Sequence, residues 1–186
     1  MKRFSVLDTP ISGVKSIERR YIGDNRGQFS RIFCASHLNA AGWRKPIFQI
    51  NHSITNHKGT IRGLHFQRVP YAEMKLVTCT QGAIWDVAVD LRKNSPTFLN
   101  WYAEELSAQN CRSLLIPEGC AHGYQTLTDN CELLYLHSAP YSPEAEGGIT
   151  PNDPLINIAW PIKIQEISAR DLQHPFLDSQ YKGIEL

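Results

Sequence analysis

Short alternating segments separated by turn residues constrain the fold of this chain most strongly. Residues 82–90, GAIWDVAVD, place positions 83, 85, 87 and 89 on one strand face and positions 84, 86, 88 and 90 on the other. Residues 131–137, CELLYLH, predict a second strand with Leu133, Tyr135 and His137 on one face. Further strands are expected at residues 75–80, 98–106, 113–116 and 123–126. Turns spaced about 8–12 residues apart predict an all-β fold, as a sandwich, barrel or jelly roll.

Helical periodicity is weak, so only short helices are expected. One is predicted at residues 35–41 and another at 168–172, where Ser168 is suited to cap the helix N-terminus. The proline-rich stretch at residues 140–154 is expected to be a surface loop. There is no repeat or linker, so residues 1–186 are predicted to form a single domain, with the segment at about 162–186 packing on the barrel.

Composition excludes several classes of protein. The net charge of +1 argues against nucleic acid as a partner, and no apolar run reaches the roughly 20 residues of a membrane helix. The chain has five cysteines, an odd number, and no two of them form a CxxC pair, so neither a disulfide framework nor a zinc site is indicated. The N-terminal residues do not form a signal peptide, and we expect a cytoplasmic protein.

A first chemical cluster lies at residues 62–67, RGLHFQ. In a regular strand Arg62 and Leu64 would face one way, and Gly63 and His65 the other. A glycine within a strand often marks the close approach of a ligand or another backbone. The alternative is an edge strand with a surface arginine and a structural histidine.

A second cluster is the string Pro117-x-Gly119-x-x-His122, which resembles the second motif of the cupin superfamily. Metal-bearing cupins carry H-x-H in their first motif, whereas this chain offers only His65 there. Since a transition-metal site usually needs three or more ligands, a metal-free barrel is expected. Alternatively, His122 is a structural histidine bonded to nearby backbone. By themselves, Asp171 and Tyr135 would be interpreted as an exposed helix carboxylate and a core tyrosine.

Taken together, a dozen strings occur in the order found in one family, over roughly residues 23–177. They are Asp24-Asn-Arg26-Gly27, Gln49-Ile-Asn51, Arg62-Gly-Leu-His65-Phe-Gln67, Lys75-Leu-Val-Thr-Cys79, Asp86-Val-Ala-Val-Asp90-Leu-Arg92, Ser95-Pro-Thr97, Ile116-Pro-Glu-Gly119, Ala121-His-Gly123, Tyr141-Ser-Pro, Asn152-Asp-Pro, Ile158-Ala-Trp160-Pro and Ser168-Ala-Arg-Asp171. This pattern resembles the dTDP-4-dehydrorhamnose 3,5-epimerase family. The resemblance implies a cupin-type jelly roll that epimerises nucleoside-diphosphate 4-keto-6-deoxy sugars through an enolate, without a cofactor.

The resemblance also implies roles for particular residues. His65 would be the base and Asp171 its partner. Lys75 would lie near the C4 oxygen, and Tyr135 would be the acid on the opposite face. Substrate-binding residues would be Arg62, for phosphate, with Arg26, Gln49, Asn51 and His122. Arg26 would come from a partner subunit, which implies a homodimer.

Two departures from the family pattern concern the nucleobase. Gln28 and Pro140 stand where the family usually has aromatic residues that sandwich thymine, and Pro151 replaces a tryptophan. Because base stacking is worth roughly 1–3 kcal/mol per base, these departures leave open whether the nucleotide is dTDP or another such as CDP, and how the sugar is deoxygenated. Whether C3, C5 or both are inverted stays open. The alternative functions are a metal-dependent cupin enzyme, such as a dioxygenase, and a non-catalytic module that binds nucleotide sugars.

Overall fold

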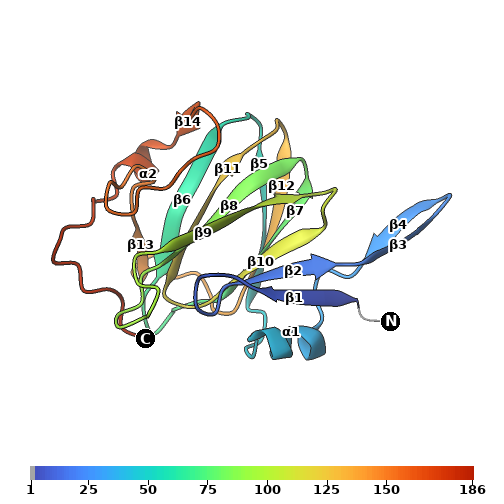
Figure 1. Ribbon diagram of the computed structural model, residues 1–186, viewed down its shortest axis with the longest axis horizontal. Coiled ribbons are helices and arrows are strands. Elements are labelled where there is room, and N and C mark those ends of the chain that lie inside the picture. The colour runs from blue at the N-terminus through green and yellow to red at the C-terminus, as the bar shows by residue number, and fades with distance from the viewer. Residues whose placement is uncertain (1–2) are drawn as a thin grey trace.

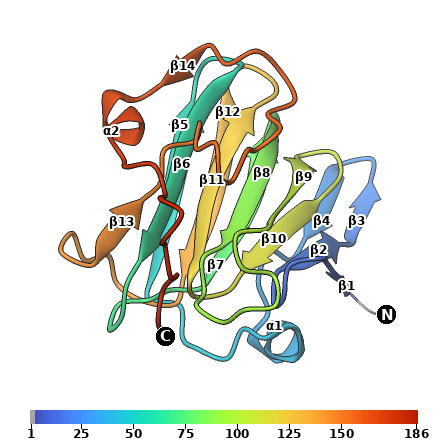
Figure 2. The same cartoon turned by 60° about the vertical axis from the view of Figure 1, so that its left-hand side comes forward.

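The computed structural model describes residues 3–186, which form two stacked β-sheets (Figures 1 and 2). The first sheet has the order β1-β2-β10-β7-β12-β5, with β1 at Phe4–Asp8, β2 at Lys15–Arg19, β10 at Arg112–Ile116, β7 at Lys75–Gln81, β12 at Cys131–His137 and β5 at Gln49–Thr55. The second has the order β13-β6-β11-β8-β9, with β13 at Glu146–Gly148, β6 at Thr60–Gln67, β11 at Cys120–Thr126, β8 at Ala83–Asp90 and β9 at Trp101–Ser107, and β14 (Glu166–Ile167) pairs with β6. The predicted all-β jelly-roll class is confirmed.

Three apolar clusters follow from the strand alternation. Ile84 and Ala88 of β8 point between the sheets, where they pack with residues of the first sheet such as Leu133. The opposite face of β8, with Val87 and Val89, is covered by a C-terminal segment that includes Ile156 and Ile184. The outer face of the first sheet packs against helix α1 (Ala35–Ala41). Because both faces of β8 are buried, this strand lies at the centre of the fold.

Most predicted boundaries agree with the structure. The strand at residues 131–137 and the helix at residues 35–41 are confirmed at both ends. Ser168 caps helix α2 (Ala169–Leu172), because its side chain accepts a hydrogen bond from the backbone N–H of Asp171. β9 begins at Trp101 rather than at residue 98, since the preceding residues form hydrogen-bonded turns.

The prediction of a surface loop at residues 140–154 is wrong in part. Strand β13 lies within it and pairs with β6, and Ile149, Thr150 and Asp153 are buried. The carboxylate of Asp153 accepts backbone hydrogen bonds from Leu155 and Leu177, which ties this segment to the C-terminal one. The segment therefore covers the sheet instead of extending into solvent.

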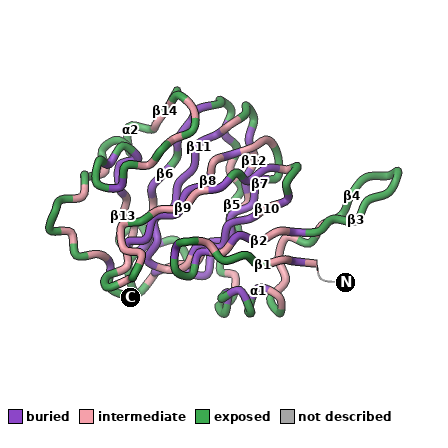
Figure 3. Tube along the Cα trace, viewed as in Figure 1, coloured by how far each residue is buried: buried purple, intermediate pink, exposed green. Residues whose placement is uncertain are grey.

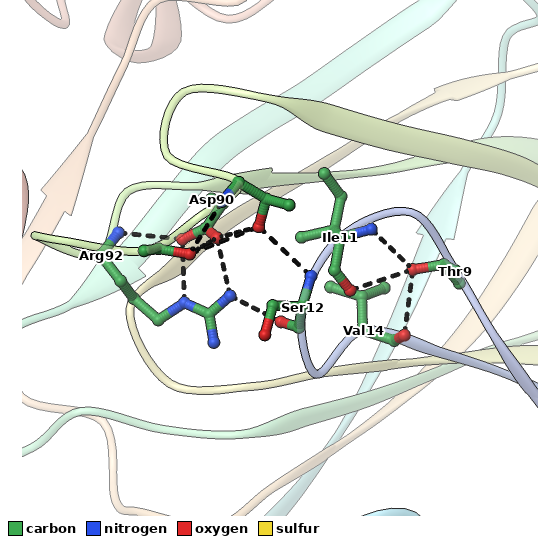
Figure 4. A network of polar contacts seen from close by, with 8 residues as sticks. Thr9, Ile11, Ser12, Val14, Asp90 and Arg92 are labelled. Carbon is green, nitrogen blue, oxygen red and sulfur yellow. Dashed lines mark hydrogen bonds and ion pairs between the residues drawn. The ribbon is translucent and has the colours of Figure 1, made fainter.

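A buried carboxylate joins the end of β8 to the loop after β1 (Figure 4). Asp90 accepts hydrogen bonds from Arg92 at 2.8 and 2.7 Å, and Arg92 also donates to the carbonyl of Ser12 at 2.6 Å. Burial alone would raise the pKa of Asp90, but the hydrogen bonds from Arg92, Ser95 and Thr97 outweigh it and hold the pKa below its ordinary value.

One hairpin extends away from the sandwich. β3 (Tyr21–Asp24) and β4 (Gly27–Ser30) project beyond the sheets (Figure 1), and most of their residues are exposed (Figure 3). Phe29 on this hairpin is 66% exposed. Within residues 3–186, no helix is long and apolar enough to cross a membrane.

Candidate active site

One cavity of about 670 Å³ collects the predicted catalytic side chains from both sheets. His65 of β6, Lys75 of β7 and Tyr135 of β12 line it, together with His122 of β11 and Asp171 of α2. His65 and Tyr135 thus face a common space large enough for a sugar ring, although 70 positions separate them in the chain.

A bulge between β6 and β11 places Arg62 and His65 on the cavity side. His122 pairs with His65 and Tyr124 pairs with Arg62, so two residues of β6 oppose the single residue Gly123. The prediction that Arg62 and Leu64 share a face is therefore wrong: Arg62 lines the cavity and Leu64 is buried in the core. The alternative of an edge strand is also wrong, because β6 lies between β13 and β11.

Gly63 makes this bulge possible. Its φ is +111°, and a Cβ atom there would lie 2.5 Å from Cα of Gly123 and 2.6 Å from the carbonyl oxygen of His122. The predicted close approach at this glycine is thus an approach of two backbones.

His65 is oriented by a buried carboxylate. Its Nε2 lies 2.8 Å from Oδ1 of Asp171, and the other carboxylate oxygen accepts the backbone N–H of Gly63 at 3.1 Å. Burial would raise the pKa of Asp171, but these bonds and the neighbouring imidazole outweigh burial, and the pKa lies below its ordinary value. An ionised Asp171 accepts the proton on Nε2, which leaves Nδ1 as the nitrogen available to a substrate. The interpretation of Asp171 as an exposed carboxylate is wrong, because the residue is buried.

Lys75 pairs with Glu73, which His137 holds in turn; the sequence did not reveal either residue as part of the site. Nζ of Lys75 lies 3.2 Å from Oε1 of Glu73, and Oε2 of Glu73 accepts a 2.7 Å hydrogen bond from Nδ1 of His137. Burial would raise the pKa of Glu73, but His137 and Lys75 together lower it. His137 shares the predicted strand face of Tyr135, a signal that could have identified it. No local pattern indicates Glu73.

Tyr135 lies beside a second histidine–carboxylate pair. His122 and Tyr135 meet edge to face with ring centroids 5.9 Å apart, and Nε2 of His122 lies 2.7 Å from Oδ1 of the fully buried Asp86. Burial, followed by the neighbouring Tyr124 and then Asp86, raises the pKa of Tyr135 well above 10. His122 thus bonds a carboxylate rather than backbone. The alternation at residues 82–90 placed Asp86 on the same face as Ile84 and Ala88, and the structure shows that this face points between the sheets.

The predicted binding residues fall into two groups. Arg62, Gln49 and Asn51 line the cavity. Arg26 and Gln28 lie on the projecting hairpin and do not line the cavity of their own chain, and neither does Pro140. Three further residues that line the cavity were not predicted to be site residues: Tyr141, Glu146 and Arg170.

The histidines of the two cupin motifs do not come together as ligands of one metal ion. Within residues 3–186, the only group of three or more potential metal-ligating side chains is His65, Asp171 and His174. His122 lies outside it, so the two cupin motifs do not supply a joint ligand set.

Comparisons with known proteins point to a single family. Residues 8–179 match the family model described as dTDP-4-dehydrorhamnose 3,5-epimerase. The chain is 46% identical over 175 residues to the dTDP-4-dehydrorhamnose 3,5-epimerase of Salmonella typhimurium, covering 93% of this chain and 95% of that protein.

Two solved structures are also similar. The dTDP-4-dehydrorhamnose 3,5-epimerase of Bacillus anthracis, with TDP and PPi bound, superposes with a TM-score of 0.90 at 41% identity, covering 94% of this chain and 99% of that one. A 3'-monoepimerase from Streptomyces bikiniensis, in complex with dTDP-quinovose, gives 0.85 at 34% identity, with coverages of 91% and 86%.

Proposed function

Since the chain belongs to the dTDP-4-dehydrorhamnose 3,5-epimerase family, we propose that it inverts C5, C3 or both of a nucleoside-diphosphate 4-keto-6-deoxyhexose. The observation that carries the proposal is the cavity shared by His65, Lys75 and Tyr135. A base, an oxyanion stabiliser and an acid are the three groups that epimerisation beside a ketone requires. A non-catalytic binding module would not need this set.

The first step is removal of a proton from a carbon next to the C4 ketone. His65 takes this proton on Nδ1, since Nε2 is bound to Asp171. The C–H electron pair moves into the ring to form an enolate. The resulting imidazolium is stabilised by the buried, ionised Asp171.

Lys75 stabilises the enolate oxygen. Its ammonium group lies at the cavity wall, and one well-placed donor to an oxyanion is worth roughly 3–4 kcal/mol. The Glu73–His137 pair orients the ammonium group, so the cation is in place before charge develops on the substrate.

Tyr135 returns a proton from the other side of the sugar ring. Its raised pKa keeps the phenol protonated at neutral pH. Transfer of this proton to the enolate carbon inverts the centre, and proton exchange with solvent restores neutral His65 and the phenol. The net reaction consumes no cofactor.

We further propose a homodimer in which each hairpin completes the partner's site. Arg26 and Gln28 lie at the exposed hairpin, outside their own cavity. The edge strand β5 borders that cavity and exposes Ile50 and Ile54, at 59% and 54%. A partner hairpin placed along this edge would bury apolar surface and bring Arg26 to the phosphates.

The nucleobase stays open between thymine and another base such as cytosine. Gln28 and Pro140 stand in place of the stacking rings that the family resemblance implies, and neither lines the cavity of its own chain. Organisation as one domain, a cytoplasmic location and the absence of nucleic-acid binding remain our predictions.

The experiment is incubation in deuterium oxide with thymidine- and cytidine-diphosphate 4-keto-6-deoxyglucose, with deuterium at C3 and C5 followed by NMR. We expect incorporation at one or both carbons, loss of incorporation in His65→Ala, and no change in Lys93→Ala, whose ammonium group pairs with Glu185 on the surface. If deuterium enters neither carbon with either nucleotide, the proposed epimerase activity is refuted.

Subunit mixing tests the dimer. Arg26→Ala and His65→Ala should each be inactive alone, and a mixture should regain activity because one of its composite sites is intact. A mixture as inactive as its components would contradict the shared site.

A further inference from the structure

A histidine that the proposed reaction does not use lies beside the base. His174 lies just beyond the C-terminal end of α2, three residues after Asp171. Its ring meets that of His65 at 72°, with centroids 5.6 Å apart. One ligand atom from each of His65, Asp171 and His174 lies within 4.8 Å of the others.

The ring of His174 is packed against the backbone, but one of its nitrogens has no hydrogen-bond partner among residues 3–186. A Cβ atom at Gly148 would lie 2.3 to 2.5 Å from three ring atoms, so the imidazole packs directly on this glycine. Its Nε2 is buried and has no hydrogen-bond partner. A buried polar atom without a partner is uncommon in folded proteins, and such an atom is available to bind a ligand or ion.

We propose that His65, Asp171 and His174 form a binding site for a transition-metal cation of the Zn²⁺ class. Two imidazoles and a carboxylate are a ligand set that Zn²⁺ accepts, with a fourth position left open. Zinc ligands lie about 3.4 Å apart when bonds are 2.0–2.2 Å long, so ligand atoms that already lie within 4.8 Å of one another need only a small approach to bind one ion. The ion reaches the site through the cavity that His65 and Asp171 line.

Binding there is inhibitory. The cation binds the Nε2 lone pair of His65 and the Asp171 carboxylate, and the proton that Nε2 carried moves to Nδ1, so no lone pair of His65 faces the substrate. This consequence rests on the proposed function, because it assumes that His65 is the base. The binding itself does not depend on that assumption and is measured without substrate.

A competing thiol must be removed before the measurement. Sγ of Cys34 lies 3.1 Å from Nδ1 of His37, and the hydrogen bond with His37 is the first of several contacts that lower the pKa of this thiol to about 6. Such a pair also attracts zinc. All variants are therefore made in a Cys34→Ser background, far from the cavity lining.

The experiment is calorimetric titration of the full chain with ZnCl₂, followed by the deuterium-exchange assay at increasing Zn²⁺. The background protein is compared with His174→Asn, with His174→Phe, which keeps a ring against Gly148, and with His52→Asn. The last removes an imidazole that pairs with only one carboxylate, Glu132.

We expect one Zn²⁺ per chain in the background protein and in His52→Asn. Affinity should fall at least tenfold in both His174 variants, since loss of even an outer-shell partner of a metal costs about 10–100-fold. Exchange should be blocked by Zn²⁺, restored by EDTA, and resistant to Zn²⁺ in the His174 variants. Equal affinity with and without His174, or no stoichiometric binding, overturns the proposal. Binding that requires His174 yet leaves exchange intact supports the site and overturns His65 as the base.

Discussion

Replacing Asp171 with asparagine tests whether the carboxylate acts by fixing the protonation of His65. In the native site one oxygen accepts from His65 and the other accepts the N–H of Gly63. An amide has only one oxygen, and the backbone N–H of Gly63 can only donate. The amide oxygen therefore turns to Gly63 and its NH₂ group meets Nε2 of His65, which must then lose its proton.

The consequence is a histidine in the wrong tautomer. With Nε2 accepting, the proton resides on Nδ1, so no lone pair faces the substrate. An amide in place of the carboxylate of a serine-protease triad lowers kcat about 10⁴-fold through the same tautomer change. We expect a loss of similar size here, about 5 kcal/mol of transition-state stabilisation at 1.36 kcal/mol per tenfold. Stability should fall far less, because the side-chain shape and the bond to Gly63 persist.

The assay is the initial rate of deuterium incorporation in Asp171→Asn, with the melting temperature measured in parallel. Asp153→Asn is the matched control: this carboxylate is also buried and accepts backbone N–H groups at both oxygens, but no histidine contacts it and it does not line the cavity. It should lose stability while the folded protein keeps its exchange rate. An Asp171→Asn protein with more than a tenth of native activity would refute the tautomer argument.

Three further outcomes are expected. Tyr135→Phe should reduce inversion by about 10²–10⁴-fold, the usual contribution of a general acid, while exchange at the same carbon is largely retained; equal losses would contradict the division of roles. Gly63→Ala should lower the free energy of unfolding in urea by roughly 2–6 kcal/mol, because overpacking and backbone strain each cost ~1–3 kcal/mol. In Gly27→Ala, which is also at positive φ but has open space around it, only the backbone strain should be lost. Equal losses in the two variants would contradict the close approach at Gly63. Because the pKa of Asp90 is lower in the folded protein, its carboxylate stabilises the fold above its unfolded pKa of about 3.9, and this stabilisation is lost as the pH falls through the lower folded pKa. Asp90→Asn should therefore reduce the free energy of unfolding at neutral pH by roughly 1.5–3 kcal/mol and weaken the fall of the melting temperature at acid pH. An unchanged dependence of the melting temperature on acid pH would contradict this role.

The fold was largely predictable because its signals are local. The alternation in residues 82–90 depends only on the two-residue period of a strand, and it placed Ile84 and Val89 on opposite faces, which the structure packs into different apolar clusters. The Ser168 cap likewise involves residues within one helical turn. The loop prediction at residues 140–154 was wrong in part because prolines indicate irregular backbone without indicating what that backbone covers.

The site was only partly predictable from the residues themselves. His65 was identified with its partner Asp171 through a family resemblance, since no spacing rule links two residues 106 positions apart. Glu73 carries no pattern at all and acquires its role from Lys75 and His137. A simple strand period also failed at Arg62, because it takes no account of a bulge.

By itself, the sequence determined which residues share a strand face, where most strands and helices form, and which reactive groups are available, because these depend on neighbours along the chain. Only the tertiary structure decided which groups meet. Pairing of β6 with β11 at one shifted register turns His65 into the cavity, and the packing of α2 on β6 delivers Asp171 to it. Register and packing are set by steric fit between distant segments, such as the contact of Gly63 with Gly123, and no local period encodes that fit.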